Sequence, residues 1–193
     1  MSDAVVDAIK AGNPAIIPTD TVYGLVATPY RSEPVLRMYE LKGRPESQPT
    51  ALLAASLDLL FECVPELRGR AGRIAVEVLP GPYTLILGNP ARRFRWLCGT
   101  TPEKIGVRVP VLPPESQAVL DRVGALAATS ANLAGGPEPR RLAEVPQELL
   151  ARCAALEGGE LPGTPSTVID FTGPEPVVIR EGAGDVSKAL QAA

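Results

Sequence analysis

Two pairs of polar residues are the part of this sequence best suited to chemistry. Lys42 and Arg44 flank a glycine and precede a proline, whereas Ser130 and Asn132 flank an alanine just after an apolar run. Lysine and arginine suit phosphate and carboxylate groups, and a hydroxyl together with an amide can orient a polar ligand. The two segments therefore predict a binding site for an anionic ligand.

The sequence contains no histidine. Histidine is the commonest general base and metal ligand, and it is part of the Ser-His and Cys-His nucleophile systems. Its absence favours chemistry based on binding and on stabilisation of transition-state charge. The three cysteines are far apart and have no histidine nearby, so we expect neither a disulfide framework nor a zinc site, and no metal site of the protein's own.

Length and charge narrow the class of protein. A chain of 193 residues with 45% hydrophobic content predicts one domain, residues 1–193, with its own core. The net charge of −3 argues against general electrostatic capture of nucleic acid, although a local basic patch stays open. We expect no membrane contact and a cytoplasmic location, because no apolar run reaches the length of a span and the start lacks a signal pattern.

Short strands and helices are mixed along the whole chain. Strands are expected at 15–17, 22–27 (or a turn there), 51–55, 83–87, 106–109, 125–128, 167–171 and 177–180. Helices are expected at 3–11, 32–41, 57–63, 68–79, 114–123, 145–156 and 185–192. This order predicts one three-layer α/β domain with helices around a mixed sheet.

Several polar residues lie where predicted strands end. Thr19–Thr21 follows the strand at 15–17, Ser130 follows the strand at 125–128, and Arg180 ends the strand at 177–180. In open α/β sheets ligands bind where strand ends meet loops. Neither a GxxxxGK[ST] motif nor a helix-opening GxGxxG motif is present, so dispersed Lys and Arg residues would have to hold the phosphates of any nucleotide.

Each feature alone also has a purely structural explanation. Lys42 and Arg44 would complement the dipole at a helix C-terminus, and Ser130 and Asn132 would form an ordinary turn. Arg108 would face water from an alternating strand. A functional explanation is favoured only if one known pattern contains all of these features together.

Such a pattern exists in the order and spacing of seven segments. They are Pro18–Leu25, Leu41–Pro45, Pro80–Leu87, Val107–Pro110, Thr129–Gly135, Ser166–Asp170 and Ile179–Gly182. From about residue 12 to residue 184 the chain resembles the YrdC/Sua5 family of L-threonylcarbamoyladenylate synthases, in their short single-domain bacterial form. The resemblance implies a three-layer YrdC-like fold, with a twisted mixed β-sheet flanked by helices and a concave, positively lined cavity.

The resemblance also implies an activity. A nucleotidyltransferase of this kind joins L-threonine, bicarbonate or CO2, and ATP into threonylcarbamoyl-AMP and pyrophosphate, for the threonylcarbamoyladenosine modification of tRNA. ATP would enter as a substrate with Mg2+, without a tightly bound cofactor. A threonylcarbamoyl-transferase complex would accept the product.

Residue by residue, the resemblance implies roles for nine positions. Lys42 and Arg44 would be catalytic; Arg44, Gln48, Asn132 and Arg180 would bind ATP; Thr21, Arg108, Ser130 and Ser166 would bind threonine. The chain departs from the family pattern at Gln48, where asparagine is usual, at Leu53, where many members have histidine, and at Arg140, where small hydroxyl residues are usual.

Two other functions stay open. One is a module of the same fold that binds double-stranded RNA or tRNA without catalysis, with at most weak RNA affinity because the chain is acidic. The other is a different enzyme on the same architecture, such as a carbamoyl-transferring domain or a dihydroxybutanone phosphate synthase. The latter would be expected to carry an acidic metal cluster and a histidine.

Overall fold

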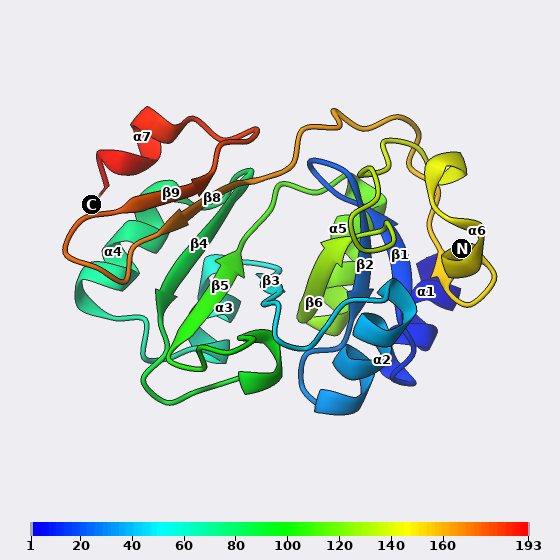
Figure 1. Ribbon diagram of the computed structural model, residues 1–193, viewed down its shortest axis with the longest axis horizontal. Helices are drawn as coiled ribbons and strands as arrows, with labels where there is room; N and C mark the ends of the chain where they lie inside the picture. Colours follow the sequence, from blue (N-terminus) through cyan, green and yellow to red (C-terminus); the bar gives the residue numbers. More distant parts are fainter. Residues whose placement is uncertain (1, 193) are drawn as a thin grey trace.

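The computed structural model describes residues 2–192, which form one mixed sheet of nine strands in the order β7-β1-β2-β6-β3-β5-β4-β8-β9 (Figure 1). The strands are β1 Ala15–Pro18, β2 Tyr23–Ala27, β3 Ala51–Ala54, β4 Tyr83–Gly88, β5 Lys104–Arg108, β6 Ala125–Ser130, β7 Ala154–Ala155, β8 Thr167–Asp170 and β9 Val177–Arg180. The pairs β1–β7, β3–β5 and β4–β8 are parallel, and the others are antiparallel. The expected mixed sheet is confirmed.

Helices cover both faces of this sheet. They are α1 Ser2–Lys10, α2 Ser32–Lys42, α3 Leu57–Cys63, α4 Gly69–Val78, α5 Pro114–Val123, α6 Gln147–Leu150 and α7 Val186–Leu190, with 3-10 turns η1 Arg95–Leu97 and η2 Leu142–Glu144. One apolar cluster joins α1 and α5 to one face of the sheet. A larger cluster joins α2, α3, α4 and α7 to the opposite face. The predicted three layers are confirmed.

The face that carries α1 and α5 is only partly covered, and the pleat of the strands explains why. Successive side chains of a strand point to opposite faces of the sheet. In β4, Leu85 and Leu87 are buried in the larger cluster, whereas Thr84 and Ile86 lie on the other face and are half-buried. No helix of residues 2–192 covers that part of the face (Figure 1). Side chains of β4, β5, β8 and β9 on one side and of β2 and β6 on the other line a cavity there.

The sequence-based elements agree with the structure except in one region. The segment 22–27 is the strand β2, and 167–180 is the antiparallel pair β8–β9, as expected. The long helix expected at 145–156 is wrong: α6 ends at Leu150, and β7 pairs in parallel with Ala15 and Ile16 of β1. Pairing with the sheet edge outweighs the helical spacing of the apolar residues. No helix within residues 2–192 is long and apolar enough to cross a membrane.

Candidate active site

A cavity of about 500 Å³ opens on the uncovered face of the sheet. Its walls come from β2, β3, β4, β5, β6, β8 and β9 and from the loops that follow α2, β1 and β6. Cavities of this size hold small-molecule ligands. Elements far apart in the sequence therefore meet around one space, as the resemblance implied.

Lys42 lies behind the wall of this cavity and is 4% exposed. It ends α2, where Gly43 takes a φ of 64° that lets the chain turn sharply. Its Nζ donates to the backbone oxygens of Ser130 at 2.6 Å and Asn132 at 2.8 Å, and also to Asn132 Oδ1. Burial lowers the pKa of Lys42 to about 8, so the ammonium still predominates at neutral pH. Lys42 thus fixes the end of β6 and does not line the cavity.

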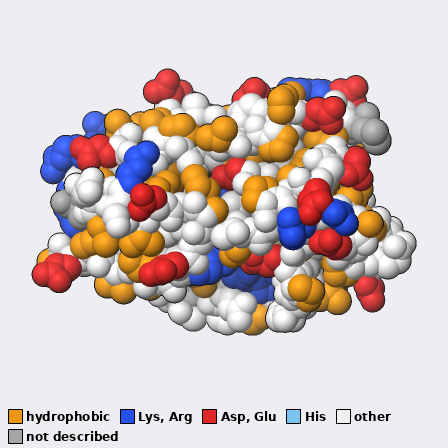
Figure 2. All heavy atoms as spheres, turned by 90° about the horizontal axis from the view of Figure 1, so that it is seen from above, with side chains coloured by type: hydrophobic (Ala, Val, Ile, Leu, Met, Phe, Trp, Pro, Cys, Tyr) orange, Lys and Arg blue, Asp and Glu red, His pale blue; other side chains and the backbone are white. Residues whose placement is uncertain are grey.

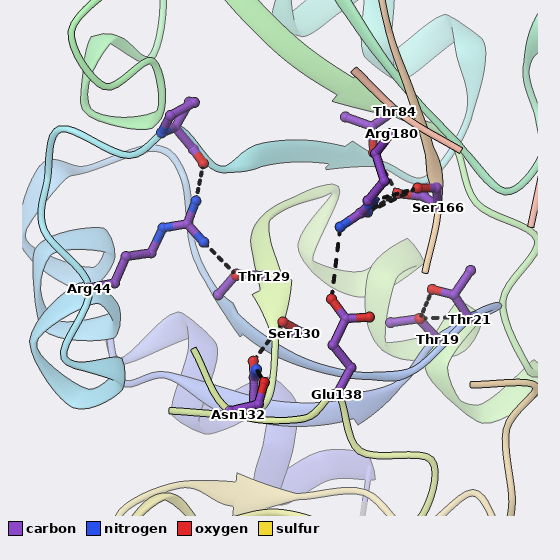
Figure 3. A network of polar contacts seen from close by, with 12 residues as sticks. Thr19, Thr21, Arg44, Thr84, Thr129, Ser130, Asn132, Glu138, Ser166 and Arg180 are labelled. Carbon is purple, nitrogen blue, oxygen red and sulfur yellow. Dashed lines mark hydrogen bonds and ion pairs between the residues drawn. The ribbon is translucent and has the colours of Figure 1, made fainter. Parts of the chain in front are cut away.

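Ser130 and Asn132 have different positions relative to the cavity. Ser130 is the last residue of β6 and lines the cavity, and its Oγ donates to Asn132 Oδ1 at 2.6 Å. Asn132 is buried, and its Nδ2 donates to the carbonyl of Gly136 (Figure 3). Asn132 therefore shapes the loop after β6 and holds the hydroxyl of Ser130 in place.

Arg44 lines the cavity from the loop after α2. Its Nη1 donates to Thr129 Oγ1 at 3.1 Å and its Nη2 donates to the carbonyl of Pro49 (Figure 3). Burial lowers the pKa of the guanidinium, which nevertheless keeps its charge because arginine titrates so far above neutral pH. Gln48 lies on the exposed turn between Arg44 and Pro49 and is not part of the cavity wall.

Arg108 lines the cavity at the end of β5. Its Nη2 lies 2.7 Å from Asp20 Oδ1, and both side chains are almost fully buried. Burial raises the pKa of Asp20, and the neighbouring guanidinium opposes that rise. Asp20 occupies one side of the guanidinium, and no hydrogen bond within residues 2–192 uses Nη1. Asp20 thereby orients a fork that still has donors for a ligand.

Hydroxyl groups complete the wall beside Arg180. Ser166 Oγ lies 2.9 Å from Thr84 Oγ1, and Thr21 Oγ1 lies 3.1 Å from Thr19 Oγ1. Arg180 of β9 donates from Nε and Nη2 to the carbonyl of Ser166, at 3.1 Å and 2.9 Å. Figure 3 shows Arg180 and Arg44 on opposite sides of the view, with Ser130 between them.

The structure thus brings most of the predicted residues together. Thr21, Arg44, Arg108, Ser130, Ser166 and Arg180 line the cavity; Lys42 and Asn132 lie buried behind it; and Gln48 lies outside it. Leu53 is buried in the cluster under α1 and α5 and does not line the cavity. The roles of these residues stay predictions.

Three charged residues of the wall were missed from the sequence: Lys104, Glu138 and Asp170. Lys104 Nζ lies 2.8 Å from Asp170 Oδ2, and the pleat alone could have indicated that Lys104 shares a face of β5 with Arg108. Glu138 lies in the loop after β6, and no pattern in that loop signals which way its side chain points.

Comparison with known proteins places the chain in a family. The family model for Sua5, YciO and YrdC, which is described as telomere recombination, matches residues 7–182. A threonylcarbamoyl-AMP synthase of Pyrococcus abyssi is 33% identical over 176 residues, or 90% of this chain and 52% of that protein. A threonylcarbamoyl-AMP synthase of Xanthomonas campestris pv. campestris is 33% identical over 164 residues, or 83% of this chain and 87% of that protein.

A solved structure agrees with these relatives. The crystal structure of Pyrococcus abyssi Sua5 complexed with L-threonine matches with a TM-score of 0.87 and 30% identity, over 97% of this chain and 55% of that chain. The chain therefore spans about half the length of the Pyrococcus relative that it matches.

Proposed function

The chain belongs to the Sua5/YciO/YrdC family, and from this membership we propose that it is an enzyme, an L-threonylcarbamoyladenylate synthase. It would act as a nucleotidyltransferase on L-threonine, bicarbonate or CO2, and ATP, and release pyrophosphate. ATP would bring Mg2+ with it as part of the substrate. Handover of the product to a threonylcarbamoyl-transferase complex, in the cytoplasm, completes the proposal.

One observation carries this proposal beyond the family name. A single cavity of about 500 Å³ contains three guanidinium groups, those of Arg44, Arg108 and Arg180, together with the hydroxyls of Thr21, Ser130 and Ser166. Guanidinium forks bind carboxylates and phosphates, and hydroxyls orient amine, carboxylate and hydroxyl groups. An amino acid and a nucleotide have these groups between them.

The chemistry needs two anions to approach each other. The ammonium group of threonine first loses one proton to solvent; the free amine then adds to CO2 and loses a second proton, which leaves a carbamate. A carbamate oxygen then attacks the α-phosphorus of ATP, and the bond from that phosphorus to the pyrophosphate oxygen breaks. Arg44 and Arg180 would offset the negative charge that develops on the phosphoryl oxygens and the leaving group.

Positioning would supply much of the remaining rate gain. Arg108, fixed by Asp20, would bind the carboxylate of threonine, and Ser130, fixed by Lys42 and Asn132, would orient the reacting group. A carbamate is already nucleophilic, so this scheme needs no histidine. The RNA-binding alternative has less support, because the relatives are named as synthases and one related structure holds L-threonine. On the one face that Figure 2 shows, acidic and basic side chains are interspersed.

Pyrophosphate release tests the proposal. The purified chain is incubated with ATP, Mg2+ and bicarbonate, and each of the common amino acids is added in turn. We expect release with L-threonine and a strict dependence on bicarbonate. Absence of release with threonine, or release that does not depend on bicarbonate, would contradict the proposed reaction.

A further inference from the structure

Glu138 is the carboxylate of the cavity with the most unused hydrogen-bonding capacity. Its side chain is 28% exposed, and Oε1 lies 3.8 Å from Arg180 Nη1, which is longer than a hydrogen bond. Within residues 2–192 its carboxylate accepts no hydrogen bond that meets ordinary distance and angle limits. In Figure 3 the side chain points up toward Arg180, between Ser130 on one side and Thr19 and Thr21 on the other.

The other two carboxylates beside the cavity are already engaged. Asp20 binds Arg108 through Oδ1 at 2.7 Å; its Oδ2 has no hydrogen-bond partner within residues 2–192, but Asp20 is buried behind the wall and does not line the cavity. Asp170 binds Lys104 at 2.8 Å and accepts from the backbone N and the Oγ1 of Thr172 at 2.8 Å and 2.6 Å. Of the two carboxylates that line the cavity, Glu138 and Asp170, Glu138 is therefore the one with acceptor positions left for a ligand.

The α-ammonium group of an amino acid substrate needs an anionic partner in this cavity. A free amino acid is a zwitterion, and the cavity supplies cations in excess for its carboxylate: Arg44, Lys104, Arg108 and Arg180. The same cations repel the α-ammonium group unless an anion faces it. We propose that Glu138 binds the α-ammonium group of the amino acid substrate and thereby makes the cavity select amino acids over the corresponding hydroxy acids, an inference that rests on the proposed function.

The backbone around Glu138 is held in place while its side chain stays free. On one side, Asn132 Nδ2 donates to the carbonyl of Gly136. On the other side, the backbone N of Tyr23 donates to the carbonyl of Pro139 at 2.9 Å. Anchors on both sides limit the movement of this short loop, so the backbone of Glu138 keeps its carboxylate within reach of the cavity.

The same geometry fits the step that follows binding. Once the ammonium has given up one proton to solvent, and the amine has added to CO2 and lost a second proton, the positive charge next to Glu138 is gone and a negative charge has replaced it. Arg180 lies beside Glu138 and offers the carbamate a cation. Glu138 therefore acts in binding and selection of the amino acid, and it takes no part in phosphoryl transfer.

Isothermal titration of the full chain with two ligands tests this inference. The ligands are L-threonine and the hydroxy acid in which a hydroxyl replaces the ammonium group of L-threonine. Because hydrogen bonds to charged groups are among the strong ones, we expect the unchanged chain to bind threonine about tenfold to a hundredfold more tightly than the hydroxy acid. Glu138→Gln should reduce that ratio to about threefold or less by weakening threonine binding alone.

Glu181→Gln is the matched control, because Glu181 is exposed, adjoins Arg180 in sequence and does not line the cavity. It should keep the discrimination of the unchanged chain. Full discrimination in Glu138→Gln, or an equal loss of both ligands, would refute the inference while leaving the proposed function intact. Tighter ATP binding with unchanged threonine discrimination would refute it as well and would make Glu138 only a competitor for Arg180. Failure of the unchanged chain to bind threonine would refute the proposed function itself.

Discussion

Replacement of Lys42 by methionine keeps an unbranched apolar side chain of nearly the same reach and removes the ammonium group. Three short hydrogen bonds are then lost, to the carbonyls of Ser130 and Asn132, at 2.6 Å and 2.8 Å, and to Asn132 Oδ1, which keeps the hydrogen bond from Ser130 Oγ; a longer contact to Ser130 Oγ at 3.4 Å is lost with them. Hydrogen bonds from a charged group contribute about 1.5 to 3 kcal/mol each, and burial of the ammonium, which lowers the pKa of Lys42, offsets part of that sum, so Lys42→Met should lower the free energy of unfolding by about 3 to 5 kcal/mol. For a chain of this size that corresponds to a fall in Tm of roughly 10 °C.

The same change should lower the proposed activity. Without the ammonium, the end of β6 and the hydroxyl of Ser130 lose the contacts that hold them at the cavity wall. A small displacement of a positioning group costs about a hundredfold in rate, so we expect a fall in kcat of that order. The substrate affinities set by Arg108 should change much less, because Arg108 has its own support from Asp20.

Thermal and urea unfolding measure the loss of stability, and a separate assay of pyrophosphate release measures the loss of kcat. Lys10→Met is the control, because Lys10 is exposed in α1, and it should change stability by no more than about 0.5 kcal/mol. A Lys42→Met variant with unchanged Tm would show that the three contacts do not hold the wall. A stable variant with a raised KM for ATP and an unchanged kcat would instead place Lys42 against the nucleotide.

Three further predictions concern two residues of the cavity wall and Lys42 behind it. Arg108→Lys replaces a planar fork by a point charge, so threonine affinity in isothermal titration should fall about tenfold, and an unchanged Kd would exclude a carboxylate clamp at this position. Thr129→Val removes one of the two acceptors of Arg44, the other being the carbonyl of Pro49, and should raise the KM for ATP a few-fold without changing the Kd for threonine; an unchanged KM would show that Thr129 does not hold Arg44 in place. The pKa of Lys42 is about 8 in the folded chain against 10.5 as its ordinary value, so the unfolded chain binds more protons between these values. The unchanged chain should therefore gain stability relative to Lys42→Met from about pH 8 to about pH 10, by about 1 kcal/mol or more. Urea titrations at several pH values measure this difference, and a difference that shrinks as the pH rises would contradict a lowered pKa of Lys42 in the folded chain.

Most of the fold could be predicted from local patterns. Apolar residues alternate in β4 and recur at helical spacing in α2 and α5, because one face of each element is buried. Such periodicity can be identified in the sequence alone. The segment 145–156 could not be predicted in this way. Its apolar residues fit a helix, but the pairing of Ala154 and Ala155 with β1 depends on an edge that only the folded sheet provides.

The site was predictable as a set of residues but not as a geometry. The family pattern correctly grouped Arg44 with Ser130, which come from distant segments and line the same cavity. The pattern did not indicate that Lys42 is buried behind the cavity wall. That position depends on how the end of α2 packs against the end of β6. The pattern also gave no sign of Glu138, because the direction of a loop side chain depends on anchors such as the bond from Tyr23 to Pro139.

Detection of the product by mass spectrometry tests the central claim most directly. The purified chain is incubated with L-threonine, ATP, Mg2+ and bicarbonate labelled with heavy carbon, and the mixture is analysed at once because the product is unstable. We expect threonylcarbamoyl-AMP whose mass carries the label, and we expect its loss in Arg44→Ala. AMP and pyrophosphate without a labelled adenylate, or no adenylate with any amino acid, would contradict the claim that this cavity joins a threonine carbamate to ATP.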